Sequence, residues 1–173
     1  MSNTILVTYA SRAGSTAEIA AAIGKTLSES GAQVDVMPMN AVKDLSAYRA
    51  VVAGSAIRGS KWLPEAIQFI QTHQSTLKQR PFAMFTVCIT LAMKNAENYR
   101  AGVADWVAPV RSIVKPLDEG FFAGILDFKK LPFNWDTLML RLTVALGIFP
   151  HGDNRDWNAI RTWAKGLSST LKV

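Results

Sequence analysis

The chain has 173 residues with 19 basic and 13 acidic side chains, which gives a net charge of +6. This length is enough to bury a sizeable core, so we expect a single domain over residues 1–173. The one cysteine excludes an internal disulfide framework. Because the basic residues are scattered and accompany no nucleic-acid-reading motif, we expect no nucleic-acid partner. There is no secretory signal pattern and no apolar run of about 18–20 residues, so we expect a cytoplasmic protein.

The first predicted strand begins at Ile5 and stops in a small, hydroxyl-rich turn that opens into a helix. This helix is predicted by apolar residues at every fourth position, namely Ile19, Ile23 and Leu27. Gly31 is expected to end it. Ser15 and Glu18 have the spacing of a capping box, in which their side chains satisfy free N–H groups at the start of a helix.

The alternation of strand and helix continues to the end of the chain. Further strands are predicted at residues 33–37, 50–53, 82–87 and 121–126. Further helices are predicted from Pro64, through residues 99–110 with a kink at Pro109, and over residues 157–171. This order predicts an α/β fold, a doubly wound five-stranded parallel sheet with helices on both faces. The ligand of such a sheet lies at the carboxyl ends of its strands.

The turn after the first strand has the composition of a phosphate-binding loop. It consists of small, hydroxyl-bearing and basic residues, namely Ser11, Arg12, Ala13, Gly14, Ser15 and Thr16. Free N–H groups of the following helix point back at this turn and favour an anion. The turn lacks the lysine and spacing of a Walker A motif, and it lacks the three glycines of a dinucleotide fingerprint. The alternative is a turn that only caps the helix and binds nothing.

Two further loops follow the third and fourth predicted strands, at residues 54–59 and 88–91. Their candidate ligand contacts are Ser55, Ala56, Ile57, Arg58, Gly59, Cys88, Ile89, Thr90 and Leu91. The pattern Ser11-x-x-Gly14-x-Thr16 between a strand and a helix resembles the FMN phosphate loop of flavodoxins. The two later loops stand where flavodoxins surround the isoalloxazine ring. The resemblance implies a flavodoxin-like fold with FMN as the cofactor.

A more specific resemblance rests on three segments. Ser11-Arg12-x-Gly14-x-Thr16, Ser55-Ala56-Ile57-Arg58, and a long aromatic and basic insertion before Asp156-Trp157 resemble the menaquinone-dependent protoporphyrinogen oxidases. This implies an FMN enzyme that removes hydrogen from a tetrapyrrole and passes electrons to a quinone. The flavin-flanking aromatic residues of electron-carrying flavodoxins are missing, and such carriers are acidic. Two alternatives stay open, a flavodoxin-type electron carrier or quinone reductase, and a flavin-free regulatory module.

Several individual side chains can be interpreted in more than one way. Arg58, the candidate catalytic residue, could hold negative charge on reduced flavin or pair with a substrate propionate, or it could form a salt bridge at the sheet rim. Arg12 could bind the phosphate or lie on the surface. Cys88 is expected to be a buried strand-end residue, because no thiolate-activating base is near it in the sequence. His73 and His151 lie far apart without metal-ligand spacing, so we assign no catalytic base and no metal.

Residues 127–150 interrupt the alternation as a long insertion after the fifth predicted strand, and insertions of this length are usually functional. Residues 137–149 form an apolar run with a single charge. This run could pack in the core or in a dimer interface. It could also lie in a bilayer interface, with headgroup contacts from Phe128, Lys129, Lys130, Phe133 and Trp135. The second interpretation predicts peripheral membrane contact through residues 128–149, on the inner face of the membrane.

Overall fold

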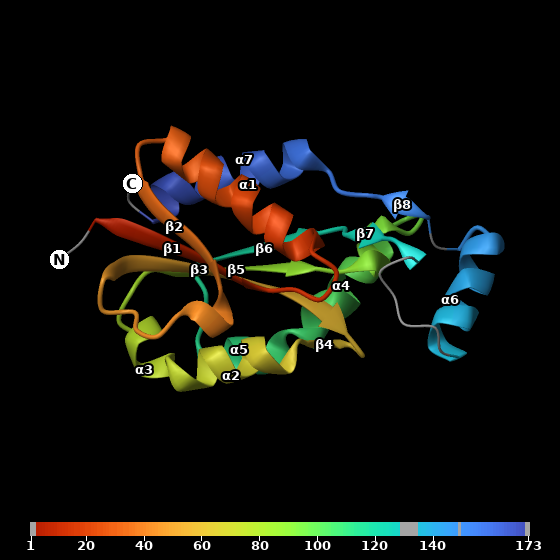
Figure 1. Cartoon of the computed structure of the whole chain (residues 1–173), viewed down its shortest axis with the longest axis horizontal. Helices are drawn as coiled ribbons and strands as arrows, with labels where there is room; N and C mark the ends of the chain where they lie inside the picture. Colours follow the sequence, from red (N-terminus) through yellow and green to blue (C-terminus); the bar gives the residue numbers. More distant parts are fainter. Residues whose placement is uncertain (1–2, 129–134, 149, 172–173) are drawn as a thin grey trace.

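The computed structural model describes residues 3–128, 135–148 and 150–171. Its centre is a five-stranded parallel sheet in the order β2-β1-β3-β5-β6, with a short strand β4 paired antiparallel to the end of β3. The strands are β1 (Thr4–Ala10), β2 (Gln33–Pro38), β3 (Tyr48–Arg58), β4 (Lys61–Trp62), β5 (Phe82–Val87) and β6 (Asp118–Phe122). The predicted doubly wound sheet is therefore confirmed (Figure 1).

Helices cover both faces of this sheet. One face carries α1 (Ser15–Glu29) and α7 (Trp157–Thr170), and the opposite face carries α2 (Pro64–Thr72), α3 (Gln74–Leu77) and α5 (Ala108–Ile113) (Figure 1). The connections also contain α4 (Glu97–Trp106) and two 3-10 turns, η1 (Met39–Ala41) and η2 (Ile89–Ala92). Connections of this kind place all five parallel strands with their carboxyl ends at one edge.

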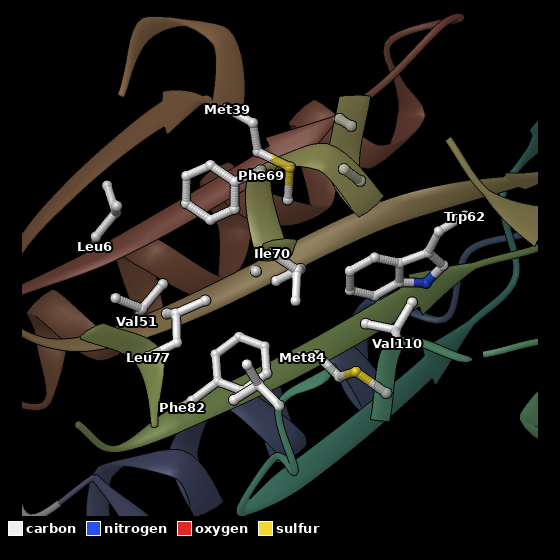
Figure 2. Close-up of a cluster of buried hydrophobic side chains, with 14 of the residues drawn as sticks. Leu6, Met39, Val51, Trp62, Phe69, Ile70, Leu77, Phe82, Met84 and Val110 are labelled. Carbon is white, nitrogen blue, oxygen red and sulfur yellow. The ribbon is translucent and has the colours of Figure 1, made fainter. Parts of the chain in front are cut away.

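Two hydrophobic cores form because successive side chains of a strand point to opposite faces. Along β1, Leu6 and Ala10 join the core under α2, whereas Ile5 and Val7 join the core under α1 and α7. Figure 2 shows the first of these cores, in which Trp62 packs beside Met84 and Val110. The Trp62 Nε1–H group donates to Thr86 Oγ1 at 2.9 Å, so this buried polar atom is satisfied.

The third strand is longer than the sequence predicted. Residues 54–58 continue β3. Residues 54–56 pair with β5, and residues 57–58 pair with β4 through a tight turn, in which Gly59 and Ser60 both have positive φ angles. Ser55 is fully buried, accepts a hydrogen bond from the Leu63 N–H group at 3.1 Å and donates to the Ala56 carbonyl at 2.9 Å. Because residues 54–58 pair with β5 and β4, the predicted loop is mostly strand.

The fifth strand ends earlier than predicted. Strand β6 stops at Phe122, which pairs with Val87, the last residue of β5, so no partner strand remains beyond it. Residues 125–126 form β7 (Ile125–Leu126), which pairs antiparallel with β8 (Gly152–Asp153) in a separate two-stranded ribbon. The predicted helix over residues 99–110 is two helices, because Pro109 lies in the first turn of α5 and lacks the N–H group that a continuous helix needs.

The insertion carries one helix, α6 (Trp135–Ala145), which lies apart from the sheet near the β7–β8 ribbon (Figure 1). It starts and ends earlier than the predicted range of 137–149. Lys129, Lys130 and Phe133 lie outside the described residues, as does the side chain of Trp135. Within the described part of the chain, no helix has the length and apolar character needed to cross a membrane.

Candidate functional site

A cavity of about 410 Å³ opens at the carboxyl edge of the sheet. Its volume lies in the range of small-molecule sites, roughly 300–1,000 Å³. Four parts of the chain line it: the turn after β1, the end of β3 with its hairpin, the end of β5 with the start of η2, and the insertion with the residues just before it. The lining residues are Ser11, Arg12, Ala13, Ser15, Thr16, Ala56, Ile57, Arg58, Gly59, Leu63, Val87, Ile89, Gly124, Ile125, Leu126 and Leu140.

The turn after β1 is preorganised by its own hydrogen bonds. Gly14 is the N-cap of α1 and adopts a left-handed conformation with φ of 93°, which favours glycine. Its N–H group donates to Ser11 Oγ at 3.1 Å. The first helical bond runs from the Glu18 N–H group to the Gly14 carbonyl at 3.1 Å. The N–H groups of residues 15–17 therefore have no acceptor within the helix and are available to an anion.

Thr16 provides an independent sign of a missing ligand. Its side chain is fully buried and lines the cavity, yet Oγ1 has no hydrogen-bond partner among the described residues. A buried hydroxyl without a partner costs free energy, so such groups are rare in folded proteins. A phosphate oxygen at the start of α1 would satisfy this hydroxyl together with the free N–H groups. The site thus fits the phosphate of FMN.

The charged residues of the cavity are cations. Arg12 contacts Glu65 in the first turn of α2, with 3.0 Å between Nη2 and Oε2, so part of its charge is already compensated. Arg58 is exposed at the cavity edge and forms no ion pair with any side chain of the described ranges. In the described part of the chain, no aspartate or glutamate lines the cavity. The electrostatic potential of the site therefore favours negative charge.

The insertion and the residues just before it contribute an apolar wall. This wall consists of Gly124 just before β7, Ile125 and Leu126 of β7, and Leu140 of α6. Sequence reasoning marked the insertion as functional but assigned none of these residues to the site. It also missed Leu63 and Val87. Their only signal in the sequence was a position next to a predicted loop, which many core residues share.

Five of the predicted cofactor residues do not line the cavity. Gly14 shapes the backbone of the turn after β1 through its positive φ angle, and the Ser55 hydroxyl accepts the Leu63 N–H group. Cys88 is buried, as predicted, and its N–H group donates to the Phe122 carbonyl at 3.0 Å. Thr90 and Leu91 lie in η2 and, unlike Ile89 of the same turn, do not line the cavity. The remaining ten border the cavity, where a role as FMN ligands stays a prediction.

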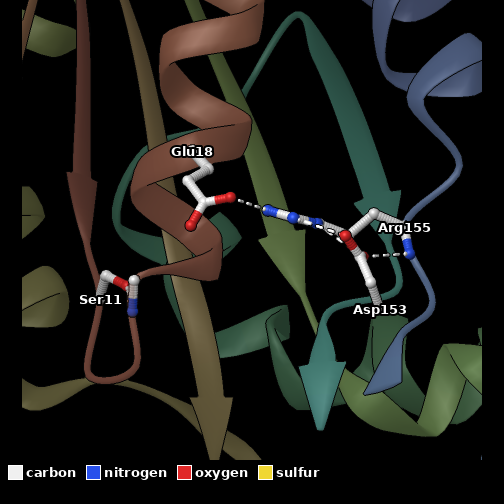
Figure 3. A network of polar contacts seen from close by, with 5 residues as sticks. Ser11, Glu18, Asp153 and Arg155 are labelled. Carbon is white, nitrogen blue, oxygen red and sulfur yellow. Dashed lines mark hydrogen bonds and ion pairs between the residues drawn. The ribbon is translucent and has the colours of Figure 1, made fainter. Parts of the chain in front are cut away.

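The predicted capping box is wrong, because the helix N-cap is Gly14 and the Glu18 side chain turns to Arg155 (Figure 3). Arg155 Nη1 lies 2.7 Å from Glu18 Oε2, and its other donors bond Asp153 at 2.8 and 2.7 Å. The hydrogen bond from Arg155 holds the pKa of the Asp153 carboxyl below its usual value and raises the pKa of Arg155. The guanidinium also lies 4.2 Å above the Trp157 ring.

The chain resembles known proteins in both sequence and fold. A model described as a flavodoxin domain matches residues 6–147. A point mutant of flavodoxin from Pseudomonas aeruginosa has a TM-score of 0.62 at 12% identity, with 98% of this chain and 99% of that chain covered. Oxidised flavodoxin 2 from Bacillus cereus has a TM-score of 0.60 at 16% identity, with 96% and 98% covered. No curated protein matches the sequence.

A third structure, a short-chain flavodoxin associated with a non-canonical PDU bacterial microcompartment, has a TM-score of 0.59 at 16% identity and covers 99% of both chains. At these identities the structural similarity establishes the fold, and the family model supplies the relationship. FMN is the cofactor of flavodoxin domains, which confirms the cofactor predicted from the sequence. Since the match extends over more than half of the chain, the protein belongs to the flavodoxin domain family.

Proposed function

We propose that the cavity holds FMN and that the chain is an oxidoreductase of the protoporphyrinogen oxidase type. In this reaction a tetrapyrrole loses pairs of hydrogen atoms and a quinone gains them as a quinol. The observation that carries the cofactor site is the buried Thr16 hydroxyl, which has no partner in the described chain and lies at the free N–H groups of α1. Bound FMN supplies the redox chemistry, while the protein supplies binding, orientation and charge.

The roles of the chain follow from the geometry of the cavity. Residues 11–16 would hold the phosphate, and residues 56–59 and 89 would border the ring. Arg58 is free of ion pairs with the described side chains, so it can stabilise negative charge that develops during reduction or bind a propionate of the substrate. The apolar wall around Leu126 and Leu140 would exclude water from the ring.

Replacing Thr16 by valine tests the phosphate site without disturbing the core. Valine has the same shape but no hydroxyl, and the hydroxyl has no partner in the described chain to lose. We expect FMN to bind about tenfold more weakly, which corresponds to about 1.4 kcal/mol, while riboflavin binding changes little. Thr8 is a matched control, because its buried Oγ1 also lacks a partner among the described residues but does not line the cavity. Equal FMN affinity in Thr16→Val and wild type would refute this phosphate site.

The Arg58 proposal is tested by its replacement with glutamine. We expect a lower flavin reduction potential and a higher KM for a propionate-bearing tetrapyrrole, because a positive charge is removed beside the ring. Lys61 on the same hairpin does not line the cavity, so Lys61→Gln is the control. Anaerobic turnover with protoporphyrinogen and a menaquinone analogue tests the reaction itself. If the Arg58→Gln protein has an unchanged reduction potential and KM, Arg58 is only a surface cation with no role in the reaction.

The runner-up function is that of a flavodoxin-type electron carrier or quinone reductase. The fold favours it, because all three solved structures described above are flavodoxins. It predicts an FMN protein that exchanges electrons with a redox partner but does not turn over protoporphyrinogen. The same anaerobic assay therefore separates the two functions.

We further propose that α6 brings the cavity to an anionic membrane, where a quinone is dissolved. Leu138, Leu142 and Leu146 follow one another at every fourth position and are 44%, 52% and 66% exposed. Leu140 of the same helix lines the cavity, so a docked α6 would place the cavity at the lipid surface. Arg141 would add about 1 kcal/mol of attraction to anionic headgroups. The apolar side chains must contribute the larger part, at about 25 cal/mol per Å² buried.

Vesicle co-sedimentation tests this membrane contact. We expect the wild-type protein to sediment with phosphatidylglycerol-containing vesicles, and a variant with Leu138, Leu142 and Leu146 changed to serine to remain in the supernatant. Leu117 is 60% exposed outside the insertion, so Leu117→Ser is the control for lost exposed apolar surface. If the triple variant is folded and still sediments, α6 does not carry the contact.

A further inference from the structure

The two sides of the cavity differ in how firmly they are built. On one side, α1 is fixed by Ile19, Ile23 and Leu27, which are fully buried against the sheet. On the other side, the wall formed by residues 124–126 and Leu140 depends on the β7–β8 ribbon and the helix it carries. This ribbon has only two paired positions, Ile125 with Asp153 and Leu126 with Gly152. A two-stranded ribbon is marginally stable by itself, so it needs an attachment.

Arg155 provides such an attachment. It is separated from β8 by Asn154, and its side chain is 5% exposed although it carries a full charge. Two of its nitrogen atoms bond both carboxylate oxygens of Asp153, while Nη1 reaches Glu18 Oε2 in the first turn of α1 at 2.7 Å (Figure 3). The side chain therefore joins the ribbon to the fixed helix across 137 positions of sequence.

Among the described residues, the hydrogen bonds of Asn154 stay within this segment. Asn154 donates its N–H group to the Gly124 carbonyl at 3.3 Å and its side-chain amide to the carbonyls of Pro150 and Gly152. These bonds hold the ribbon and its approach together as a unit. The ion pair between Arg155 and Glu18 joins that unit to α1, and Gly124 of the unit lies next to Ser15 at the start of the same helix.

We propose that Arg155 is a positioning residue, which holds the insertion wall against α1 and so keeps the cavity at the width that FMN requires. This inference rests on the proposed FMN site. Charge-assisted hydrogen bonds from a buried arginine are strong and directional, which suits such a role. An alternative use of Arg155 would be to neutralise Glu18 near the bound phosphate. The two roles predict opposite effects when Glu18 is removed.

The decisive variant is Glu18→Ala, because it cuts the link to α1 and leaves the Arg155–Asp153 pair intact. Glu18 is 53% exposed, so the chain should stay folded. We expect affinities for FMN and riboflavin to fall by the same factor, about tenfold. The phosphate contacts at the start of α1 are unchanged, and only the opposite wall of the cavity loses its attachment. Amide hydrogen exchange at residues 124–126 and 152–154 should accelerate in the apoprotein, while exchange in α1 stays slow.

Glu29→Ala is the matched control, because Glu29 is an exposed carboxylate in the last turn of the same helix and pairs with Lys25. It should change neither flavin binding nor exchange. If Glu18→Ala binds FMN more tightly, or changes FMN affinity but not riboflavin affinity, Arg155 acts on the phosphate charge and the positioning role fails. Unchanged exchange in the ribbon also overturns it, whatever the flavin affinity. A wild-type protein that binds no FMN refutes the proposed function, while the exchange experiment still decides the attachment.

Discussion

Gly54 allows a sharp test of how the two central strands pack beneath the cavity. It lies in β3 beside Phe85 of β5, and a methyl group added at Gly54 would fall within the Phe85 ring. That ring is fully buried and lies 6.4 Å from the ring of Phe122 and 6.3 Å from that of Trp163, measured between centroids. The ring therefore has little room to move, and Gly54→Ala must strain the core.

The expected cost of Gly54→Ala is about 2–3 kcal/mol, the upper part of the range for overpacked cores. Unfolding entropy of about 2.1 cal/mol/K per residue gives about 0.36 kcal/mol/K for this chain. The Tm should therefore fall by roughly 6–8 °C. Thermal unfolding followed by circular dichroism or calorimetry measures this shift directly.

Gly102 supplies the matched control, because a methyl group there meets nothing within 4 Å and the residue lies inside helix α4. Gly102→Ala should raise stability by about 0.5–1 kcal/mol, the helix penalty of glycine. A double variant with Phe85→Leu should cost less than the two single changes combined, by about 1 kcal/mol or more. An unchanged Tm in Gly54→Ala, or additive costs in the double variant, would contradict the packing argument.

Two further stability predictions follow from named contacts. Asp156 caps α7 by accepting the N–H groups of Asn158 and Ala159 at 2.9 Å each, so Asp156→Ala should lower the free energy of unfolding by about 1 kcal/mol in urea titrations. Burial lowers the pKa of His73, whose ring is tilted against the Phe69 ring with 4.7 Å between their centroids. The folded state thus disfavours the protonated form. Stability should be full above the ordinary pKa of about 6.5 and should fall as the pH drops below it. The slope should be weaker in His73→Phe; equal slopes would exclude this residue as the cause.

The elements that the sequence predicted well are those set by neighbouring residues. Ile19, Ile23 and Leu27 repeat with the helical period, and all three are buried in the core under α1. The parallel sheet also followed from pattern, because strands that alternate with helices form such a sheet.

The errors concern residues whose surroundings come from distant parts of the chain. Ser55 was expected in a loop, but it lies in β3, and its hydroxyl accepts the Leu63 N–H group once β3 pairs with β4. Glu18 was assigned to a capping box, but Arg155 lies 137 positions away and binds its carboxylate. No local pattern contains such partners, so the choice between a cap, a ligand contact and an ion pair could not be made from the sequence.

The alternation of elements, the parallel sheet and the place of the turn at residues 11–16 could be predicted from the chain alone, because hydrophobic periodicity and helix-start chemistry act over a few residues. Which side chains face the cavity depends on the folded arrangement of the chain. Leu140 joins the wall because α6 lies near the β7–β8 ribbon, and the charge of Arg12 is partly compensated because Glu65 lies in the first turn of α2. Burial, ion pairing and cavity shape depend on distances between residues far apart in the chain, and these distances exist only in the folded state.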